Sequence, residues 1–452
     1  MARGVLLRHN VKLSRKRGLA DMNDRTVSQA RAQLSRATFA VIAALGVLST
    51  AGMEVAAKHA ASFVATDLGT LGGSFSEALA VSSTGVVVGR SSIKDDNAVH
   101  AFVWSEHTGM TDLQPDIQPS LSKLGGALQS LADAIGDDGI IAGFGFLTDE
   151  SRAIVNFHAF TRTRANGVVD LSELGKFDNS LPTAVNSKGA VVGFANRPGD
   201  ANSRAFLWTQ QRGVEDLGTL GGSSGTANAI SDNGIVVGQS ATSHNLPHAF
   251  MWTRHTGMVD LGTLDEGLTS AAQAVNDDGV IVGSSQTTQM ASDGHAISHA
   301  FVWTRRTGMV DIVPDRFDGL DSFAERINGR FVIGQTFVAD GTGPKHGFAW
   351  TRKDGFVDIG TLGGDASFAA GVNDQGLVVG NSQTAGNAAI RAFVWSASTR
   401  TMVPLDSGDG TSTANAITDN FIVGSSCDAG NCHATLWKPN SRSRKDRRGN
   451  DD

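Results

Sequence analysis

The residues best suited to chemistry recur at fixed spacing in this chain. A histidine opens the phrase His-Ala-Phe-Val-Trp, so that a tryptophan stands four residues after it, and an aspartate stands twelve residues after it. Three of the copies contain His100, Trp104, Asp112, His248, Trp252, Asp260, His299, Trp303 and Asp311. A histidine beside a carboxylate can act as a general acid–base pair, but catalysis does not need near-copies of one pair throughout a chain. The repetition favours a structural role, in a polar and aromatic network that ties the strands of each repeat together.

Two other kinds of chemical site can be drawn from residues outside these positions. The candidates are metal-binding histidine pairs, His244 with His248 and His295 with His299, and hydrolase carboxylates, Asp149, Glu150 and Asp293. Each requires side chains to converge in space. No phosphate-binding loop, nucleophile elbow or His-Glu-x-x-His motif accompanies them. The sequence therefore predicts no catalytic, metal or cofactor-binding residues and no cofactor, and it favours a non-enzymatic protein while leaving enzyme activity open.

The chain contains two cysteines, Cys427 and Cys432, separated by a short polar stretch. No further cysteines are present to complete a zinc site. In an oxidising compartment two such cysteines pair most simply with each other. We expect a local disulfide.

Four short segments recur around the repeated residues, and each has the pattern of a β-strand. In 100–104 the large side chains alternate with Ala101 and Val103, and the run 86–88 is entirely valine. Turns such as Ser-Asp-Asn-Gly at 231–234 join two of the segments; Asp and Asn begin a tight turn and Gly supplies its positive φ. Turn formation explains these acidic residues without bound calcium.

Eight copies of this unit predict an all-β fold, an eight-bladed β-propeller with four strands in each blade. The repeats begin at 63–69 with a fourth-strand segment and end at 433–437 with a third-strand segment. The N-terminal strand can therefore complete the last blade and close the ring, leaving no open edge. Small residues, as in Ala78-Leu-Ala80, suit strands around a narrow axis. The alternative is another β-repeat array, which would require distinct capping repeats.

The copies resemble the bacterial HAF family of extracellular repeats, named for the His-Ala-Phe element. The likeness covers about 63–437 and includes the long phrase at 248–264, His-Ala-Phe-Met-Trp-Thr-Arg-His-Thr-Gly-Met-Val-Asp-Leu-Gly-Thr-Leu. The resemblance implies an exported repeat protein and brings no catalytic residues with it. Arg204 and Arg391 replace the histidine in two copies, which weakens any chemical requirement for that residue.

The two ends of the chain differ from the repeats. Residues 1–57 have the order of a signal peptide with a long basic leader: the apolar stretch 38–48 precedes small residues, with cleavage expected after Ala51 or Ala57. An uncleaved anchor is the alternative, but the apolar stretch is shorter than the roughly 20 residues that span a bilayer. We expect a repeat domain over 63–438, a disordered polar tail over 439–452, and no transmembrane span after cleavage. The expected location is extracellular, at the cell surface or in the periplasm.

Loop length varies at two connections in each repeat. The connection before each His-Ala-Phe segment and the connection between repeats differ among copies, whereas the others are nearly constant. In a four-stranded antiparallel blade these two connections share one face, and the longest are 113–131, 144–156 and 284–298. The net charge of −7 and the lack of a basic run in the repeats argue against nucleic acid. The leading hypothesis is an exported scaffold that binds an extracellular carbohydrate or protein through this face. The alternatives are an exported glycan lyase or hydrolase and a structural surface protein. Neutral drift of the loops is the alternative explanation of their variable length.

Overall fold

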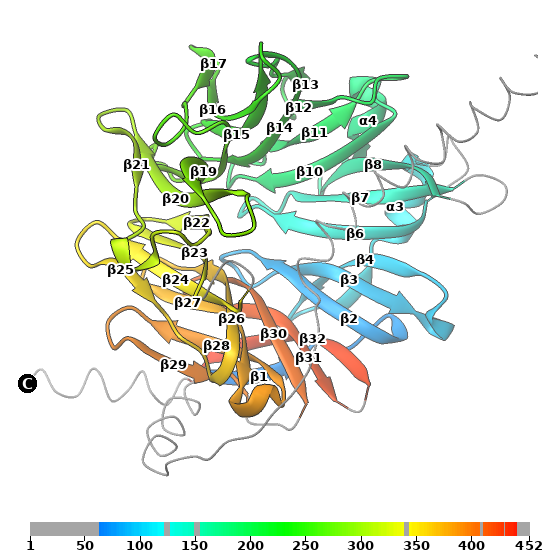
Figure 1. Ribbon diagram of the computed structural model, residues 1–452. Coiled ribbons are helices and arrows are strands. Elements are labelled where there is room, and N and C mark those ends of the chain that lie inside the picture. Colours follow the sequence, from blue (N-terminus) through cyan, green and yellow to red (C-terminus); the bar gives the residue numbers. More distant parts are fainter. Residues whose placement is uncertain are drawn as a thin grey trace, which may run out of the picture. The chain divides into compact units, whose positions relative to one another are not determined.

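The computed structural model describes residues 63–121, 127–148, 154–338, 343–406, 410–428 and 430–440. In these ranges the chain folds into short strands that follow one another in blades of four (Figure 1). Blade 1 contains β2 (Gly72–Val81), β3 (Val87–Ile93), β4 (Val99–Ser105) and β5 (Gly109–Asp112). Blade 2 contains β6 (Ala127–Ile135), β7 (Ile141–Thr148), β8 (Ile154–Thr163) and β9 (Gly167–Asp170). Blade 3 contains β10 (Asn179–Val185), β11 (Val191–Asn196), β12 (Ser203–Thr209) and β13 (Gly213–Asp216). Blade 4 contains β14 (Gly221–Ile230), β15 (Val236–Thr242), β16 (Pro247–Thr253) and β17 (Gly257–Asp260).

The second half of the ring repeats this order. Blade 5 contains β18 (Ser270–Val275), β19 (Ile281–Met290), β20 (Ala296–Thr304) and β21 (Gly308–Asp311). Blade 6 contains β22 (Ser322–Asn328), β23 (Phe331–Phe337), β24 (Lys345–Thr351) and β25 (Gly355–Asp358). Blade 7 contains β26 (Gly363–Val372), β27 (Leu377–Thr384), β28 (Ile390–Ser396) and β29 (Thr401–Pro404). Blade 8 contains β30 (Thr411–Ile417), β31 (Ile422–Asp428), β32 (Asn431–Pro439) and β1 (Phe63–Asp67). Short helices in the connections are η2 (Lys94–Asp96), α3 (Gln114–Leu121), α4 (Leu171–Gly175), η4 (Asp315–Phe317) and η5 (Ala385–Asn387).

The ring closes through the first strand of the chain. β1 pairs antiparallel with β32, from Phe63 opposite Pro439 to Asp67 opposite Thr435. The first strands of successive blades contact one another in order, and β30 of blade 8 contacts β2 of blade 1. One parallel bridge, Phe75 to Cys432, joins the sheets of blades 8 and 1. The predicted eight-bladed β-propeller is therefore confirmed, and the ring leaves no place for the alternative of an open β-repeat array.

The core lies between the blades. The phenylalanine of each His-Ala-Phe segment is buried; those fully buried are Phe102, Phe160, Phe206, Phe250, Phe301, Phe348 and Phe393. The tryptophans pack against the preceding blade, as Trp252 of blade 4 does against Val192 and Leu207 of blade 3. Each such buried aromatic side chain stabilises the fold by about 2–3 kcal/mol. The tryptophans thus join neighbouring blades, rather than forming one network with the histidines inside a blade.

Blade 2 has Arg162 at the tryptophan position, and a helix in the preceding connection explains it. α3 places Ile117 and Leu121 in the core between blades 1 and 2, where both are almost fully buried. The Arg162 guanidinium reaches back to α3 and forms an ion pair with Asp116 at 2.8 Å. The inserted helix therefore supplies the apolar packing that a tryptophan supplies elsewhere.

Acidic residues in the turns between the first two strands join several neighbouring blades by hydrogen bonds. The Asp232 carboxylate accepts the Ser187 backbone N–H of the preceding blade, and the Asp277 carboxylate accepts the Asp232 N–H, both at 2.8 Å. The Asp137 carboxylate accepts the N–H of Ser83 in the same way. These carboxylates join one turn to the next, in keeping with their interpretation as turn residues.

The limits of the repeat domain can be stated within the described residues. β32 continues to Pro439, one residue beyond the predicted boundary at 438, because that residue still pairs with Phe63 of β1. The predicted signal peptide at 1–57 and residues 441–452 of the predicted tail lie outside the described ranges. In the part of the chain that is described, no helix has the length and apolar character needed to cross a bilayer.

Candidate binding face

Two kinds of connection share one face of the ring, here called the loop face. Because the strands of a blade are antiparallel, the connection from second to third strand and the connection to the next blade emerge on the same side. The opposite face, here called the turn face, carries the two tight hairpin turns of each blade, except that in blade 8 no turn joins β32 to β1. The helices η2, α3, α4, η4 and η5 all belong to connections of the loop face. Structural variation among the blades is therefore concentrated on that face.

The repeated histidine and aspartate form the base of the loop face. In six blades the histidine Nδ1–H donates to the aspartate at 2.6–3.0 Å; the pairs are His100–Asp112, His158–Asp170, His248–Asp260, His299–Asp311, His346–Asp358 and His433–Asp67. In blades 3 and 7 an arginine replaces the histidine, and Arg204 and Arg391 lie 3.5 and 3.4 Å from Asp216 and Asp406. The pair joins the third strand to the fourth, and in blade 8 it spans the closure of the ring.

The aspartate also holds the start of the connection to the next blade. Its second oxygen accepts the backbone N–H two residues further along, for example Gly262 N–H on Asp260 and Ser172 N–H on Asp170, both at 2.8 Å. One carboxylate therefore fixes both the third strand and the beginning of the loop. The geometry gives these residues a supporting function beneath the loops.

Buried serines join neighbouring blades, a feature that the sequence analysis did not identify. The serine hydroxyl of each first strand accepts an N–H from the third strand of the preceding blade at 2.7–3.0 Å; the serines are Ser76, Ser130, Ser180, Ser270, Ser322, Ser367 and Ser412. All seven are nearly inaccessible to solvent. The sequence signal was present, a serine at the same position of the innermost strand in seven copies, with Gly225 replacing it in blade 4.

Three connections on the loop face have the same compact structure and provide a reference for the others. The segments entering blades 1, 4 and 7 share Thr-Leu-Gly-Gly, and the first glycine has φ near 100° in each. The second glycine permits close contact: a Cβ on Gly73 would lie 2.2 Å from Ser92 Oγ and 2.4 Å from Asp96 Oδ1. The Asp96 carboxylate accepts the Ser74 N–H at 2.7 Å and so joins the two connections of blade 1.

Blade 5 departs most from this reference. β19 and β20 extend into a long hairpin that ends at Met290 and Ala296. Met290 and Leu268, from the adjacent connection between blades 4 and 5, are 62% and 61% exposed. The segments 284–298 and 144–156 were expected to be loops, but β19–β20 and β7–β8 occupy most of the described part of each, because continued strand pairing satisfies the backbone hydrogen bonds.

The histidine at the end of this hairpin is held on both sides. His295 Nε2 lies 2.8 Å from the Asp321 carboxylate, and its Nδ1 contacts Asp293. These two hydrogen bonds, the one to Asp321 first, raise the pKa of His295 above its usual value. Asp321 also accepts the Ser298 N–H at 2.7 Å, so it anchors the hairpin at two points.

The candidate residues that lie in the described ranges do not converge on a metal or catalytic centre. His299 Nδ1 is occupied by Asp311, and both ring nitrogens of His295 contact carboxylates, so this histidine pair is already engaged. His244 is exposed on the turn before β16, and Asp149 and Glu150 lie outside the described residues. Across the described ranges, no group of three or more His, Cys, Asp or Glu side chains is placed to hold a metal ion.

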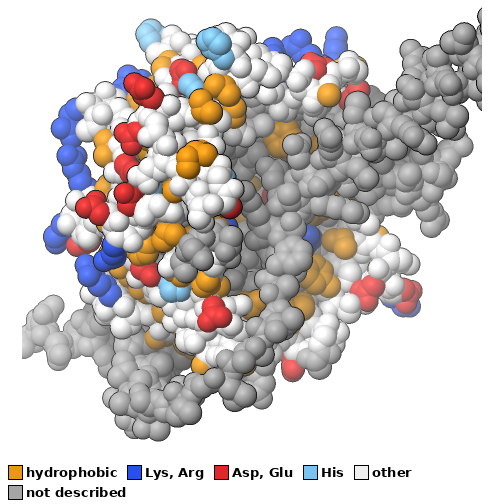
Figure 2. Space-filling view, in the orientation of Figure 1, with side chains coloured by type: hydrophobic (Ala, Val, Ile, Leu, Met, Phe, Trp, Pro, Cys, Tyr) orange, Lys and Arg blue, Asp and Glu red, His pale blue; other side chains and the backbone are white. Residues whose placement is uncertain are grey.

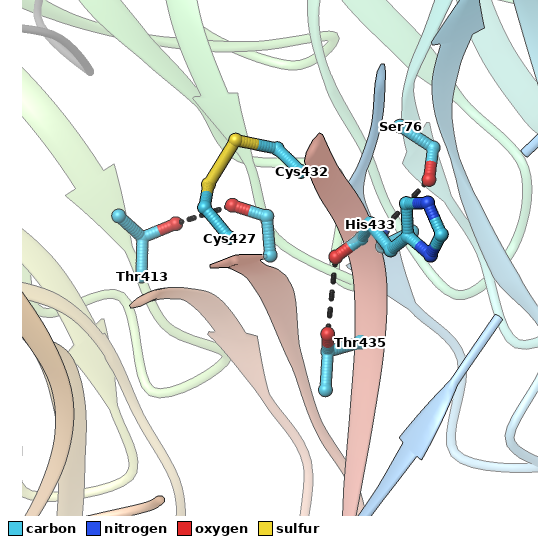
Figure 3. The surroundings of a disulfide bond; sticks show 8 residues. Ser76, Thr413, Cys427, Cys432, His433 and Thr435 are labelled. Carbon is cyan, nitrogen blue, oxygen red and sulfur yellow. Dashed lines mark hydrogen bonds between the residues drawn. A yellow bond between two sulfur atoms is a disulfide. The ribbon is translucent and has the colours of Figure 1, made fainter. Parts of the chain in front are cut away.

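Cys427 and Cys432 form a disulfide at the tip of the β31–β32 hairpin (Figure 3). The bridge lies on the loop face beside the closure of the ring, because Cys432 is also the bridge partner of Phe75 in β2. Nearby, Thr413 and Ser425 hydroxyls hydrogen-bond at 3.1 Å, and the Ala434 N–H donates to Ser76 (Figure 3). The disulfide therefore restrains the loop of the blade that contains both ends of the repeat domain.

The innermost strands carry a mixed set of polar side chains. Asn228 and Asn415 donate to the Ala272 and Ala78 carbonyls of the following blades at 2.8 and 2.9 Å. At the equivalent position of blade 2, burial raises the pKa of Asp133 to about 7, an effect that the nearby Arg90 guanidinium partly opposes. Arg90 itself forms an ion pair with Glu77 at 2.6 Å.

Comparison with known proteins gives likenesses of fold alone. No family model matches the chain, and no curated protein matches it. Porphyromonas gingivalis dipeptidyl peptidase 4 is 11% identical with a TM-score of 0.47, over 85% of this chain and 59% of that chain. The Dos1 propeller is 10% identical with a TM-score of 0.45, over 83% and 95%. TolB from Acinetobacter baumannii is 12% identical with a TM-score of 0.35, over 69% and 77%.

Proposed function

We propose that this chain is an exported binding protein of the HAF type, which engages an extracellular ligand through its loop face. The supporting observation is that the base of the loop face is nearly the same in every blade, whereas the loops above it differ. The His–Asp pair or its arginine replacement recurs in all eight blades, whereas the loops above range from the compact form of blade 1 to the long hairpin of blade 5. Loops on such a rigid base can change without disturbing the core.

Blade 5 is the proposed centre of ligand contact. Met290 and Leu268 expose apolar side chains there, and apolar side chains are enriched at the centres of protein interfaces. His295, held by Asp321, keeps the hairpin in a defined position. These features favour a protein ligand on this face, with a carbohydrate as the alternative. Export is supported by the predicted signal peptide and by the Cys427–Cys432 disulfide.

A loop graft tests this proposal. Blade 4 closes the same pair of strands with residues 242–246, where blade 5 uses 287–297. The purified chain should bind a partner on an extracellular protein and glycan array, and replacing 287–297 by 242–246 should weaken that binding at least tenfold. The matched control exchanges 93–98 of blade 1 for 384–389 of blade 7, two compact connections of equal length. If the graft folds and still binds with unchanged affinity, blade 5 is not the contact surface.

Glycan cleavage is the outcome that would favour the enzyme alternative. Asp293, one of the carboxylates considered for hydrolysis, is hydrogen-bonded to His295. If the chain cleaves an array glycan, an enzyme function replaces the binding proposal. If cleavage continues in the Asp293→Asn variant, the catalytic residues lie elsewhere in the chain.

A further inference from the structure

The turn face carries a second feature, a row of basic side chains at the outer edge of blades 5, 6 and 7. The turns between the third and fourth strands of these blades present five exposed side chains, Arg305, Arg306, Arg352, Lys353 and Arg400. These turns project from the same flank in Figure 1, and Figure 2 shows Lys and Arg side chains gathered along that flank. We call this set the basic rim. Among the described residues, no carboxylate lies within ion-pairing distance of any of the five.

The equivalent position in blade 4 shows what the basic rim lacks. Arg254 stands where Arg305 and Arg352 stand in their blades, and it is paired with Glu215 on the fourth strand of blade 3 at 2.7 Å. The residues equivalent to Glu215 are Val259 in blade 4 and Val310 in blade 5. Both valines are exposed, 37% and 44%. The strands that face Arg305 and Arg352 therefore offer them no carboxylate at that position.

A shallow hollow of about 20 Å³ lies on the rim between blades 6 and 7. Its lining includes Trp350, Trp395, Asp354 and Arg400. Trp350 is partly exposed, and Asp354 is held in place by a hydrogen bond from the Thr351 hydroxyl at 2.8 Å. An aromatic surface, a fixed carboxylate acceptor and a guanidinium together suit a sugar that carries a negative charge: the ring packs on the aromatic side chain, the hydroxyls donate to the carboxylate, and the anion pairs with the arginine.

We propose that the basic rim binds an acidic polysaccharide, with one charged sugar lying across the mouth of the shallow hollow between blades 6 and 7, against Trp350. One or two cations recur on each of three successive blades, which suits a polymer with repeated charges. The hollow adds sites for hydroxyl groups, which a flat anionic membrane does not offer. This surface is distinct from the loop face, so it adds a second function to the proposed one.

Binding measurements on the purified chain test the proposal. Alginate and dextran sulfate separate carboxylate from sulfate recognition, and uncharged dextran tests the need for charge. We expect an acidic polysaccharide to bind, with affinity that falls as salt is raised, and no binding of dextran. The double variant R352Q/K353Q should weaken binding at least tenfold, and R400Q should do the same by affecting the hollow.

The control variant R212Q/R254Q also removes two positive charges, but from turns outside the basic rim. It should keep affinity within about twofold of the wild type, and the blade 5 graft should leave polysaccharide binding unchanged. Equal losses in R352Q/K353Q and R212Q/R254Q would overturn the proposal, because net charge alone would then explain binding. Tighter binding to anionic phospholipid vesicles or to single-stranded DNA than to either acidic polysaccharide would also overturn it.

Discussion

Replacing Asp170 by alanine should destabilise the propeller by about 3 kcal/mol, whereas the same replacement of Asp260 should cost less than about 1 kcal/mol. The two aspartates make the same two hydrogen bonds. Each accepts its repeat histidine, at 2.8 Å for His158 and 2.9 Å for His248, and each accepts the N–H two residues further along at 2.8 Å. The difference lies in burial. The side chains of His158 and Asp170 are each 7% exposed, whereas those of His248 and Asp260 are 20% and 42% exposed.

The magnitude follows from what each substitution leaves behind. Without Asp170, the His158 Nδ1–H and the Ser172 N–H lose their acceptor where little water can replace it, and each unsatisfied buried donor costs about 1–3 kcal/mol. Among the described residues His158 Nε2 has no hydrogen-bond partner, so the ring gains no compensating bond from them. Around Asp260, water can hydrate both donors, and the loss is that of a surface pair.

Urea unfolding of the two variants beside the wild type measures the difference. We expect a clear fall in the midpoint for Asp170→Ala, a small fall for Asp260→Ala, and equal denaturant dependence in all three proteins. Equal destabilisation by the two substitutions would refute the reasoning, because burial would then not determine the contribution of the His–Asp pair. A larger effect of Asp260→Ala would point to a role for the blade 4 pair beyond support of its loop.

Three further predictions concern the disulfide and two ionisable groups. Replacing Cys427 and Cys432 by serine should reduce stability by about 2 kcal/mol, because the bridge closes a short loop, and thermal unfolding without reductant measures the loss. The His295 contacts should stabilise the hairpin fully below the usual His pKa of 6.5, and this stabilisation should fade as pH rises through the higher pKa of the folded state. NMR titration of His295 should show the raised pKa. The protection of the hairpin amides against hydrogen exchange, relative to an unfolded peptide at the same pH, should fall at high pH. The pKa of Asp133 is about 7 in the folded protein and 3.8 in the unfolded chain, so the free energy of unfolding should fall as pH rises between these values. Urea unfolding of Asp133→Asn should show a weaker fall with pH and higher stability than the wild type at pH 8.

The propeller could be predicted from the sequence because its signals are local and repeated. The His-Ala-Phe phrase marks the third strand, and the aspartate twelve residues after His100 marks the end of the fourth. The match between 63–69 and a fourth-strand segment was sufficient to predict closure, since a ring needs only one strand from the other end of the chain. Strands and turns are determined by residues that lie within a few positions of each other in the sequence, so their patterns can be recognised without a structure.

Other features depend on contacts that the order of residues does not display. The tryptophans were expected inside each blade's network, but Trp252 packs on blade 3, because the inter-blade layer is the apolar one. The reason for Arg162 at the tryptophan position of blade 2 is also a contact in space: α3 fills the gap and supplies Asp116. The basic rim collects residues between 305 and 400 that no single segment of sequence concentrates.

Blades 2 and 5 show which changes in the connections the fold tolerates. The helix inserted between blades 1 and 2 enters the core, and Arg162 at the tryptophan position is the matching change in the next blade. The longer hairpin of blade 5 rises above the His299–Asp311 pair, which keeps the same contact as in blade 1, and Phe301 and Ala300 below it remain fully buried. A change confined to the space above the His–Asp pair therefore needs no compensation in the core. For that reason the loops, and not the repeated histidines, are where a ligand preference can arise at least cost to stability.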